Sequence, residues 1–218
     1  SRAATSSQGT VSEDRQHPVA LVGGDLGAVL LPLGALVAQH EVEHVLAQGG
    51  EKADHKAETG AVGFPAIKGI GDCMLYIVDR YDDKGTIHDP DYEYLPGVDP
   101  HPQGAGFHTI DHLTHNVIRG NMDTWYKFYH DTFNFREIKY FDIKGKQTGL
   151  TSRALTSPDG KIRIPINEST DDHSQIEEYL REYKGEGIQH IAIASEDIYA
   201  GTDRIRDAGM EFMPGPPD

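Results

Sequence analysis

Two histidines occupy equivalent positions in a repeated segment, which makes them the first candidates for metal ligands. Ile110-Asp-His112 and Ile188-Gln-His190 both lie in apolar runs typical of a strand, and a helical pattern follows each run. The repeat predicts that the two strands lie side by side, so that both imidazoles can reach one ion, and neutral imidazole is a common metal ligand. His115 lies three residues beyond His112 and would face the other side of a strand, so the repeat favours His112.

A second histidine pattern competes with this one. His40-Glu41-Val42-Glu43-His44 fits the H-E-x-x-H pattern of zinc peptidases, in which two histidines on a helix hold zinc and the glutamate activates water. Such peptidases usually carry uncharged residues at the two middle positions, and Glu43 departs from that habit. A zinc site and a chance match on a surface helix therefore both stay open, and the second is favoured.

The elements that must position the histidines form two copies of one unit. The first copy is predicted as a strand, a helix and three strands, over residues 107–117, 121–133, 135–143, 148–155 and 161–166. A further helix is expected over residues 174–183, before the second copy begins with a strand at 187–194 and a helix at 197–208. Asn121 and Asp197 are the predicted N-caps. This β-α-β-β-β order predicts an α+β fold.

Composition limits the classes of function. The formal net charge of −15 over 218 residues excludes a nucleic-acid partner, because phosphate contacts need clustered Lys and Arg. The single cysteine, Cys73, excludes an intrachain disulfide and a thiolate zinc cage, and it favours a reducing, cytoplasmic location. Residues 19–37 are long and apolar enough to suggest a membrane span, but Asp25 and several glycines interrupt them, so we expect no membrane partner.

Several collinear segments resemble the 4-hydroxyphenylpyruvate dioxygenase family of the vicinal-oxygen-chelate superfamily. The resemblance runs from about residue 55 to the end and rests chiefly on Pro65-Ala-Ile-Lys-Gly-Ile-Gly71, Ile110-Asp-His-Leu-Thr-His-Asn-Val117, Tyr140-Phe-Asp-Ile-Lys-Gly145, Arg163-Ile-Pro-Ile-Asn-Glu168 and Gly185-Glu-Gly-Ile-Gln-His190. Residues 1–50 do not share it, which suits an unrelated fusion, a wrongly translated reading frame or a divergent start.

The resemblance implies a glyoxalase-like fold of paired βαβββ modules that form an open mixed-sheet barrel, with the last module truncated. In that arrangement residues 1–54 are unassigned, and residues 55–105 are the end of an N-terminal module and a connection. Residues 106–186 are the module with the first histidine ligand, and residues 187–218 start the module with the second.

The resemblance also implies an activity. Members of the family hold iron(II) with two histidines and one glutamate, and they convert 4-hydroxyphenylpyruvate and O2 to homogentisate and CO2 in tyrosine breakdown. Carried over, His112 and His190 are the iron ligands, and the substrate pocket is formed by Ser152, Asn167, Gln175 and Gln189. The glutamate ligand would lie beyond Asp218, so the isolated chain is expected to bind iron weakly and to be inactive.

Other functions stay open at this point. A 4-hydroxymandelate synthase uses the same substrate and the same iron site. A noncatalytic pseudoenzyme or binding module could also keep the fold without the metal. Family members often assemble into homo-oligomers, and the oligomeric state of this protein stays open.

Overall fold

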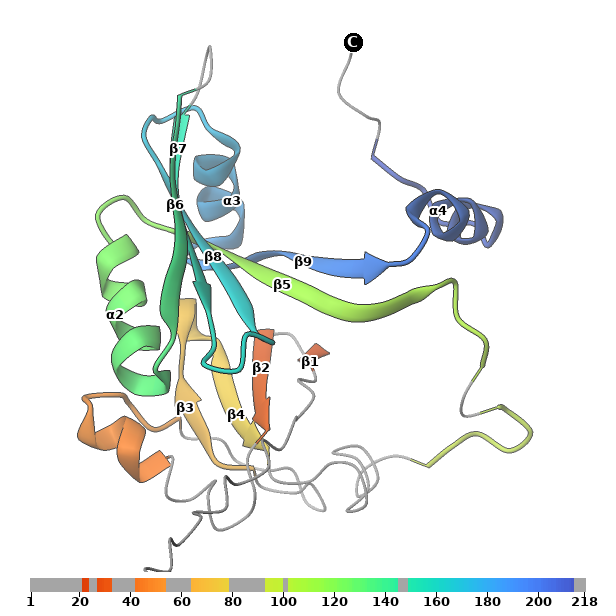
Figure 1. Cartoon of the computed structure of the whole chain (residues 1–218), viewed down its shortest axis with the longest axis horizontal. Coiled ribbons are helices and arrows are strands. Elements are labelled where there is room, and N and C mark those ends of the chain that lie inside the picture. Colours follow the sequence, from red (N-terminus) through yellow and green to blue (C-terminus); the bar gives the residue numbers. More distant parts are fainter. Residues whose placement is uncertain are drawn as a thin grey trace, which may run out of the picture.

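The chain folds into two sheets, a larger one of five strands and a smaller one of four (Figure 1). The computed structural model describes residues 21–23, 27–32, 42–53, 64–78, 93–99, 102–144 and 149–213. The apolar segment 19–37 is described only over 21–23 and 27–32, which are strands. Among the described residues, no helix is long and apolar enough to cross a membrane.

The larger sheet confirms the predicted open mixed sheet. Its strands are β5 (Phe107–Val117), β6 (Arg136–Lys144), β7 (Gly149–Thr156), β8 (Arg163–Ser169) and β9 (Gly187–Ser195), in the order β6-β7-β8-β5-β9. β5 and β8 are parallel and the other pairs are antiparallel. The first strands of the two units, β5 and β9, are neighbours, as the repeat predicted.

Three helices accompany this sheet: α2 (Met122–Phe133), α3 (Gln175–Tyr183) and α4 (Ile198–Asp207). The Asp197 side chain accepts a hydrogen bond from the backbone N–H of Ala200, which confirms it as an N-cap. The prediction for Asn121 is wrong in its chemistry. Its side chain caps nothing, and its amide donates instead to the Glu186 carboxylate at 2.9 Å. The charged acceptor, 65 residues away, holds the amide NH2 group, and the amide oxygen makes no capping hydrogen bond.

The smaller sheet packs against one face of the larger one. Its strands are β1 (Leu21–Gly23), β2 (Gly27–Pro32), β3 (Ala66–Lys68) and β4 (Met74–Val78), in the order β1-β2-β4-β3, and the short 3-10 helix η1 (Ile70–Asp72) joins β3 to β4. Ile67 and Leu75 share a core cluster with Leu113 of β5, while Ile70 and Cys73 join the cluster beneath α2. The two sheets therefore share their cores.

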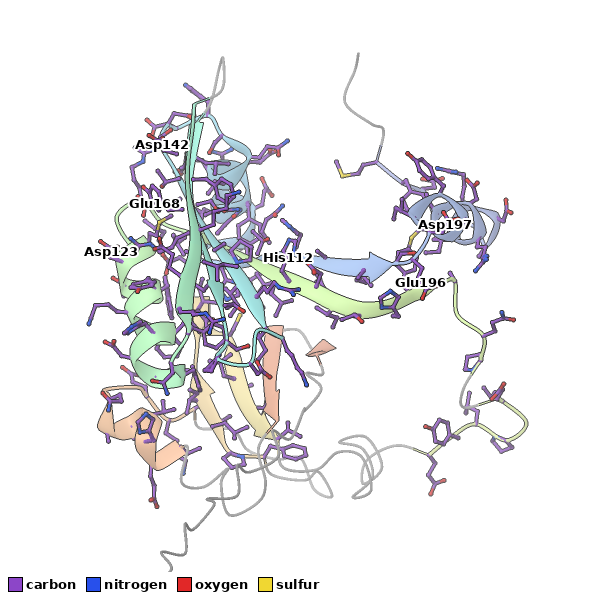
Figure 2. All side chains as sticks on the ribbon, viewed as in Figure 1. His112, Asp123, Asp142, Glu168, Glu196 and Asp197 are labelled. Carbon is purple, nitrogen blue, oxygen red and sulfur yellow. The ribbon has the colours of Figure 1, made fainter. Side chains whose placement is uncertain are left out.

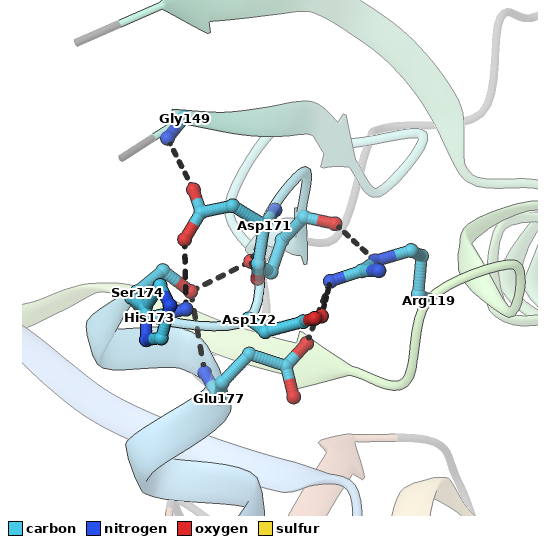
Figure 3. A network of polar contacts seen from close by, with 8 residues as sticks. Arg119, Gly149, Asp171, Asp172, His173, Ser174 and Glu177 are labelled. Carbon is cyan, nitrogen blue, oxygen red and sulfur yellow. Dashed lines mark hydrogen bonds and ion pairs between the residues drawn. The ribbon is translucent and has the colours of Figure 1, made fainter. Parts of the chain in front are cut away.

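A polar network holds the turn between β8 and α3 (Figure 3). The Asp171 carboxylate accepts hydrogen bonds from the backbone N–H groups of Gly149, at 2.7 Å, and His173, at 2.9 Å. These hydrogen bonds lower the pKa of Asp171. Arg119, at the end of β5, donates to Asp172 at 2.8 Å. The network ties the ends of three strands to the start of α3.

The H-E-x-x-H pattern lies partly outside the described residues, which do not include His40 and Glu41. Residues 42–47 are helical, and Glu43 is exposed while Val45 is fully buried. This burial is the pattern of a helix with one face on the core.

Candidate metal centre

His112 and His190 meet because β5 and β9 pair in antiparallel register. Thr114 lies opposite His190, and His112 lies opposite Ala192. His112, Thr114 and His190 therefore share one face of the larger sheet, which we call the histidine face. The centroids of the two imidazole rings are 5.5 Å apart, with 74° between the ring planes. The predicted convergence of these two side chains is what the structure shows.

Irregularities in the β5–β9 ladder accompany both histidines. Between the pairs Ile110–Ile193 and His112–Ala192, β5 carries one extra residue, Asp111. Between the pairs formed by His115 with Ile188 and by Thr114 with His190, β9 carries one extra residue, Gln189. A β-bulge of this kind changes the direction of the side chains around it. Each histidine thus follows directly after a bulge residue.

His115 faces the other side of the sheet, as its spacing from His112 predicted. It is fully buried, and its Nε2 shares a hydrogen bond of 2.8 Å with the Tyr129 hydroxyl of α2. Burial lowers the pKa of His115 to about 3, because the apolar surroundings disfavour the imidazolium. His115 is therefore a neutral core residue that packs α2 against the sheet.

The two facing histidines are held differently. The Nδ1 of His112 lies 2.7 Å from Oδ2 of Asp111, whose Oδ1 accepts a hydrogen bond of 2.8 Å from Arg163 on β8. His190 contacts the Gln189 amide oxygen through Nδ1, and its Nε2 lies 2.9 Å from the Thr114 hydroxyl. Burial and then the neighbouring His112 lower the pKa of His190, which favours the neutral imidazole.

In the part of the chain that the structure describes, no group of three His, Cys, Asp or Glu side chains converges as metal ligands would. Among those residues, no carboxylate is therefore placed to act as a third ligand beside the two imidazoles. Glu168 is directed toward α2 and accepts a hydrogen bond of 3.1 Å from the backbone N–H of Met122. Glu196 lies at the far end of β9, next to α4 (Figure 2). Neither of these glutamates converges with the two imidazoles.

The pocket residues expected from the resemblance fall into two groups. Ser152 of β7 and Asn167 of β8 are register partners, and Asn167 also lies opposite Asn116 of β5. All three are on the face of the sheet that carries His112, because Ile166, which precedes Asn167 and is the register partner of His115, faces the core under α2.

The other two expected residues lie elsewhere. Gln189 contacts His190, whereas Gln175 is the first residue of α3 and is exposed. Sequence reasoning missed two further residues on the histidine face, Thr114 and Asn116. Both are 2% exposed, and the Asn116 amide oxygen is buried without a hydrogen-bond partner. Their spacing of two and four residues from His112 was the available signal.

The donors present suit a metal that takes imidazole ligands, such as iron(II). Both imidazoles come from paired strands. The Gln189 amide and the Thr114 hydroxyl contact His190, and the Asp111 carboxylate contacts His112. Two donors make an incomplete set for a two-histidine, one-carboxylate site, and the described residues do not supply the third.

Two protein-family models match parts of the chain. The model of the Glyoxalase/Bleomycin resistance protein/Dioxygenase superfamily matches residues 109–218, and the model of the N-terminal part of hydroxyphenylpyruvate dioxygenase matches residues 27–93. The second match includes residues 27–50, so the expectation that residues 1–50 do not share the resemblance is wrong for this part of the chain.

Curated relatives and a solved structure extend the match. A 4-hydroxyphenylpyruvate dioxygenase of Pseudomonas aeruginosa is 52% identical over 82% of this chain and 50% of its own length. One of Pseudomonas sp. (strain P.J. 874) is 56% identical over 74% of this chain and 46% of its own length. The chain spans about half the length of these relatives.

A solved mutant of 4-hydroxymandelate synthase from Streptomyces coelicolor shares the fold, with a TM-score of 0.68 at 21% identity over 87% of this chain and 55% of its own. The chain therefore belongs to the Glyoxalase/Bleomycin resistance protein/Dioxygenase superfamily, in which it is a relative of the 4-hydroxyphenylpyruvate dioxygenases.

Proposed function

We propose that the protein carrying this chain is an iron(II)-dependent dioxygenase that converts 4-hydroxyphenylpyruvate and O2 to homogentisate and CO2, a step of tyrosine breakdown. One observation carries the proposal: two imidazoles converge at a centroid distance of 5.5 Å in a chain that is 52% identical to a 4-hydroxyphenylpyruvate dioxygenase. Neither the likeness nor the histidine pair alone would point to one substrate.

In this proposal His112 and His190 hold the iron, with a carboxylate as the third ligand. The bound iron would supply the redox chemistry that activates O2, with electrons from the 2-oxo acid. The protein's own contribution is to orient the substrate and to exclude water.

Ser152 and Asn167 suit substrate orientation because they lie side by side on the histidine face. Their hydroxyl and amide groups can form hydrogen bonds to a phenol or a carboxylate without adding a charge near the metal. Gln189 has the same chemistry and lies next to His190. Gln175 is proposed for the pocket from the family position alone, since it is exposed at the start of α3.

The deciding experiment uses the product of the complete open reading frame that encodes this chain, reconstituted with iron(II) without oxygen. Substrate and O2 are then added and the products are identified by mass spectrometry. Homogentisate supports the proposal, and 4-hydroxymandelate would assign the synthase reaction instead. Absence of turnover in an iron-loaded protein would indicate a noncatalytic member of the fold.

Variants test the ligand assignment. His112→Ala and His190→Ala are each expected to abolish both turnover and tight iron binding. His108→Ala is the matched control, because His108 is an exposed histidine of the same strand. Full activity in either ligand variant would show that the assignment is wrong.

Three further properties remain predictions. The 218-residue chain alone is expected to bind iron weakly and to be inactive, which iron titration and the same assay would test. A cytoplasmic location and homo-oligomeric assembly are also expected, and cell fractionation and light scattering would test them.

A further inference from the structure

A carboxylate holds one of the two imidazoles and not the other. Asp111 contacts Nδ1 of His112 at 2.7 Å through one oxygen and accepts a hydrogen bond from Arg163 at 2.8 Å through the other. Arg163, Asp111 and His112 form a line that runs from β8 across the β5 bulge to the histidine face. The Asp111 side chain is 44% exposed and that of Arg163 is 46% exposed, so solvent screens this line only in part.

The line determines where the His112 proton is. An ionised carboxylate can only accept hydrogen bonds, so the 2.7 Å contact requires a proton on Nδ1. In a neutral imidazole the other nitrogen, Nε2, then carries the lone pair that a metal needs. Arg163 restrains the carboxylate, because its guanidinium donates to the oxygen that does not face the imidazole.

His190 provides an internal comparison. Its Nδ1 contacts the amide of Gln189, which also occupies a bulge position. The amide oxygen accepts in the present orientation, but a half-turn of the amide would present its NH2 group instead, so Gln189 can pair with either tautomer. The Nε2 of His190 also faces the Thr114 hydroxyl, which is again both a donor and an acceptor. Only the His112 side of the pair has a partner that enforces one tautomer.

We propose that Asp111, restrained by Arg163, is a positioning residue that keeps His112 protonated at Nδ1 and directs its Nε2 to the metal. This inference rests on the proposed function for the assignment of His112 as a metal ligand and for the identity of the metal. A carboxylate behind a ligand histidine fixes the ring and raises its basicity, and losing such a partner costs about 10–100-fold in metal affinity. We expect a loss in this range for Asp111→Ala.

The first test needs no metal. Histidine-labelled protein is examined by 15N NMR, and the His112 signals are assigned by their absence in His112→Gln. Wild type is expected to show a single tautomer with the proton on Nδ1. Asp111→Asn is nearly the same size and is expected to show both tautomers, because its amide can donate or accept. Arg163→Gln is expected to show a smaller shift in the same direction.

The second test measures affinity with cobalt(II), which takes similar ligands and has visible absorption bands that report its coordination. Asp123→Asn is the matched control, since Asp123 also pairs with an arginine, at 2.7 Å, but lies on α2. We expect the control to bind cobalt(II) like wild type. Circular dichroism shows whether each variant folds. If Asp111→Ala does not fold, the nearly isosteric Asp111→Asn decides the question alone.

The outcomes separate this inference from the proposed function. A single Nδ1-protonated tautomer in Asp111→Asn, with cobalt affinity within about twofold of wild type, would overturn the inference even in an active dioxygenase. Losing a carboxylate that positions a ligand histidine should instead weaken metal binding by about 10–100-fold. A mixed tautomer with weakened cobalt binding would support it even in a protein that forms no homogentisate.

Discussion

Replacing Glu186 by glutamine should destabilise the protein although it changes one atom. Glu186 precedes β9 and is 8% exposed. Its carboxylate accepts three hydrogen bonds, from the Ile118 backbone N–H at 2.8 Å, the Asn121 amide at 2.9 Å and the Trp125 indole N–H at 2.7 Å. These contacts join the start of α2 and the end of β5 to the segment that leads into β9.

The size of the effect follows from the number of donors. The first two donors share Oε1, and the indole faces Oε2. A glutamine can keep one oxygen, so at best its NH2 faces the indole N–H and one bond is lost. A hydrogen bond to a charged group contributes about 1.5–3 kcal/mol, and the two remaining bonds fall to the neutral range of about 0.5–1.5 kcal/mol. Easier burial of a neutral amide offsets part of this loss, which leaves about 2–4 kcal/mol.

Urea denaturation monitored by fluorescence measures this change directly, because Trp125 is the only tryptophan and is one of the three donors. Glu178→Gln, on the exposed side of α3, is the matched control and should lie within about 0.5 kcal/mol of wild type. A Glu186→Gln protein as stable as this control would refute the reasoning that the carboxylate joins α2 to both strands.

Three other predictions concern single sites. Gly71→Ala should destabilise by at least about 2 kcal/mol in the same urea assay, because φ is +54° and a Cβ would lie 1.7 Å from the Glu186 carbonyl oxygen. Stability should fall as pH drops from about 6.5 toward 3, because His115, whose pKa is lowered to about 3 in the folded state, binds a proton first in the unfolded state. This contribution is at most about 5 kcal/mol. It should be missing in His115→Gln, which should lose less stability in acid than wild type in urea titrations at several pH values. Asp197→Ala should cost about 1 kcal/mol through loss of the α4 cap, whereas Asp197→Asn should retain most of it, which thermal melts would show.

Local patterns predicted most of the secondary structure. The strands and helices of residues 107–208 begin and end within a few residues of their expected bounds, because alternating apolar residues, caps and turn residues act over short distances. Asn121 shows the limit of such reasoning. Its position at the start of α2 was predicted correctly, but its hydrogen-bond partner is Glu186, which no local pattern indicates.

The candidate site was also determined in part by the sequence alone. The repeat identified His112 and His190 and separated them from His115, because strand neighbours and side-chain parity follow from the order of the elements. The family resemblance identified Ser152 and Asn167, which the structure then placed on the same face.

Tertiary structure decided how the site is held. The bulges at Asp111 and Gln189 depend on the register of two strands that are far apart in the chain, and register is set by packing rather than by local propensity. The contact of Arg163 with Asp111 exists only because β8 lies parallel to β5. Residue types and their spacing therefore determined which side chains could bind a metal. The pairing of distant strands determined how those side chains are held, because hydrogen bonds between distant segments form only when the chain is folded.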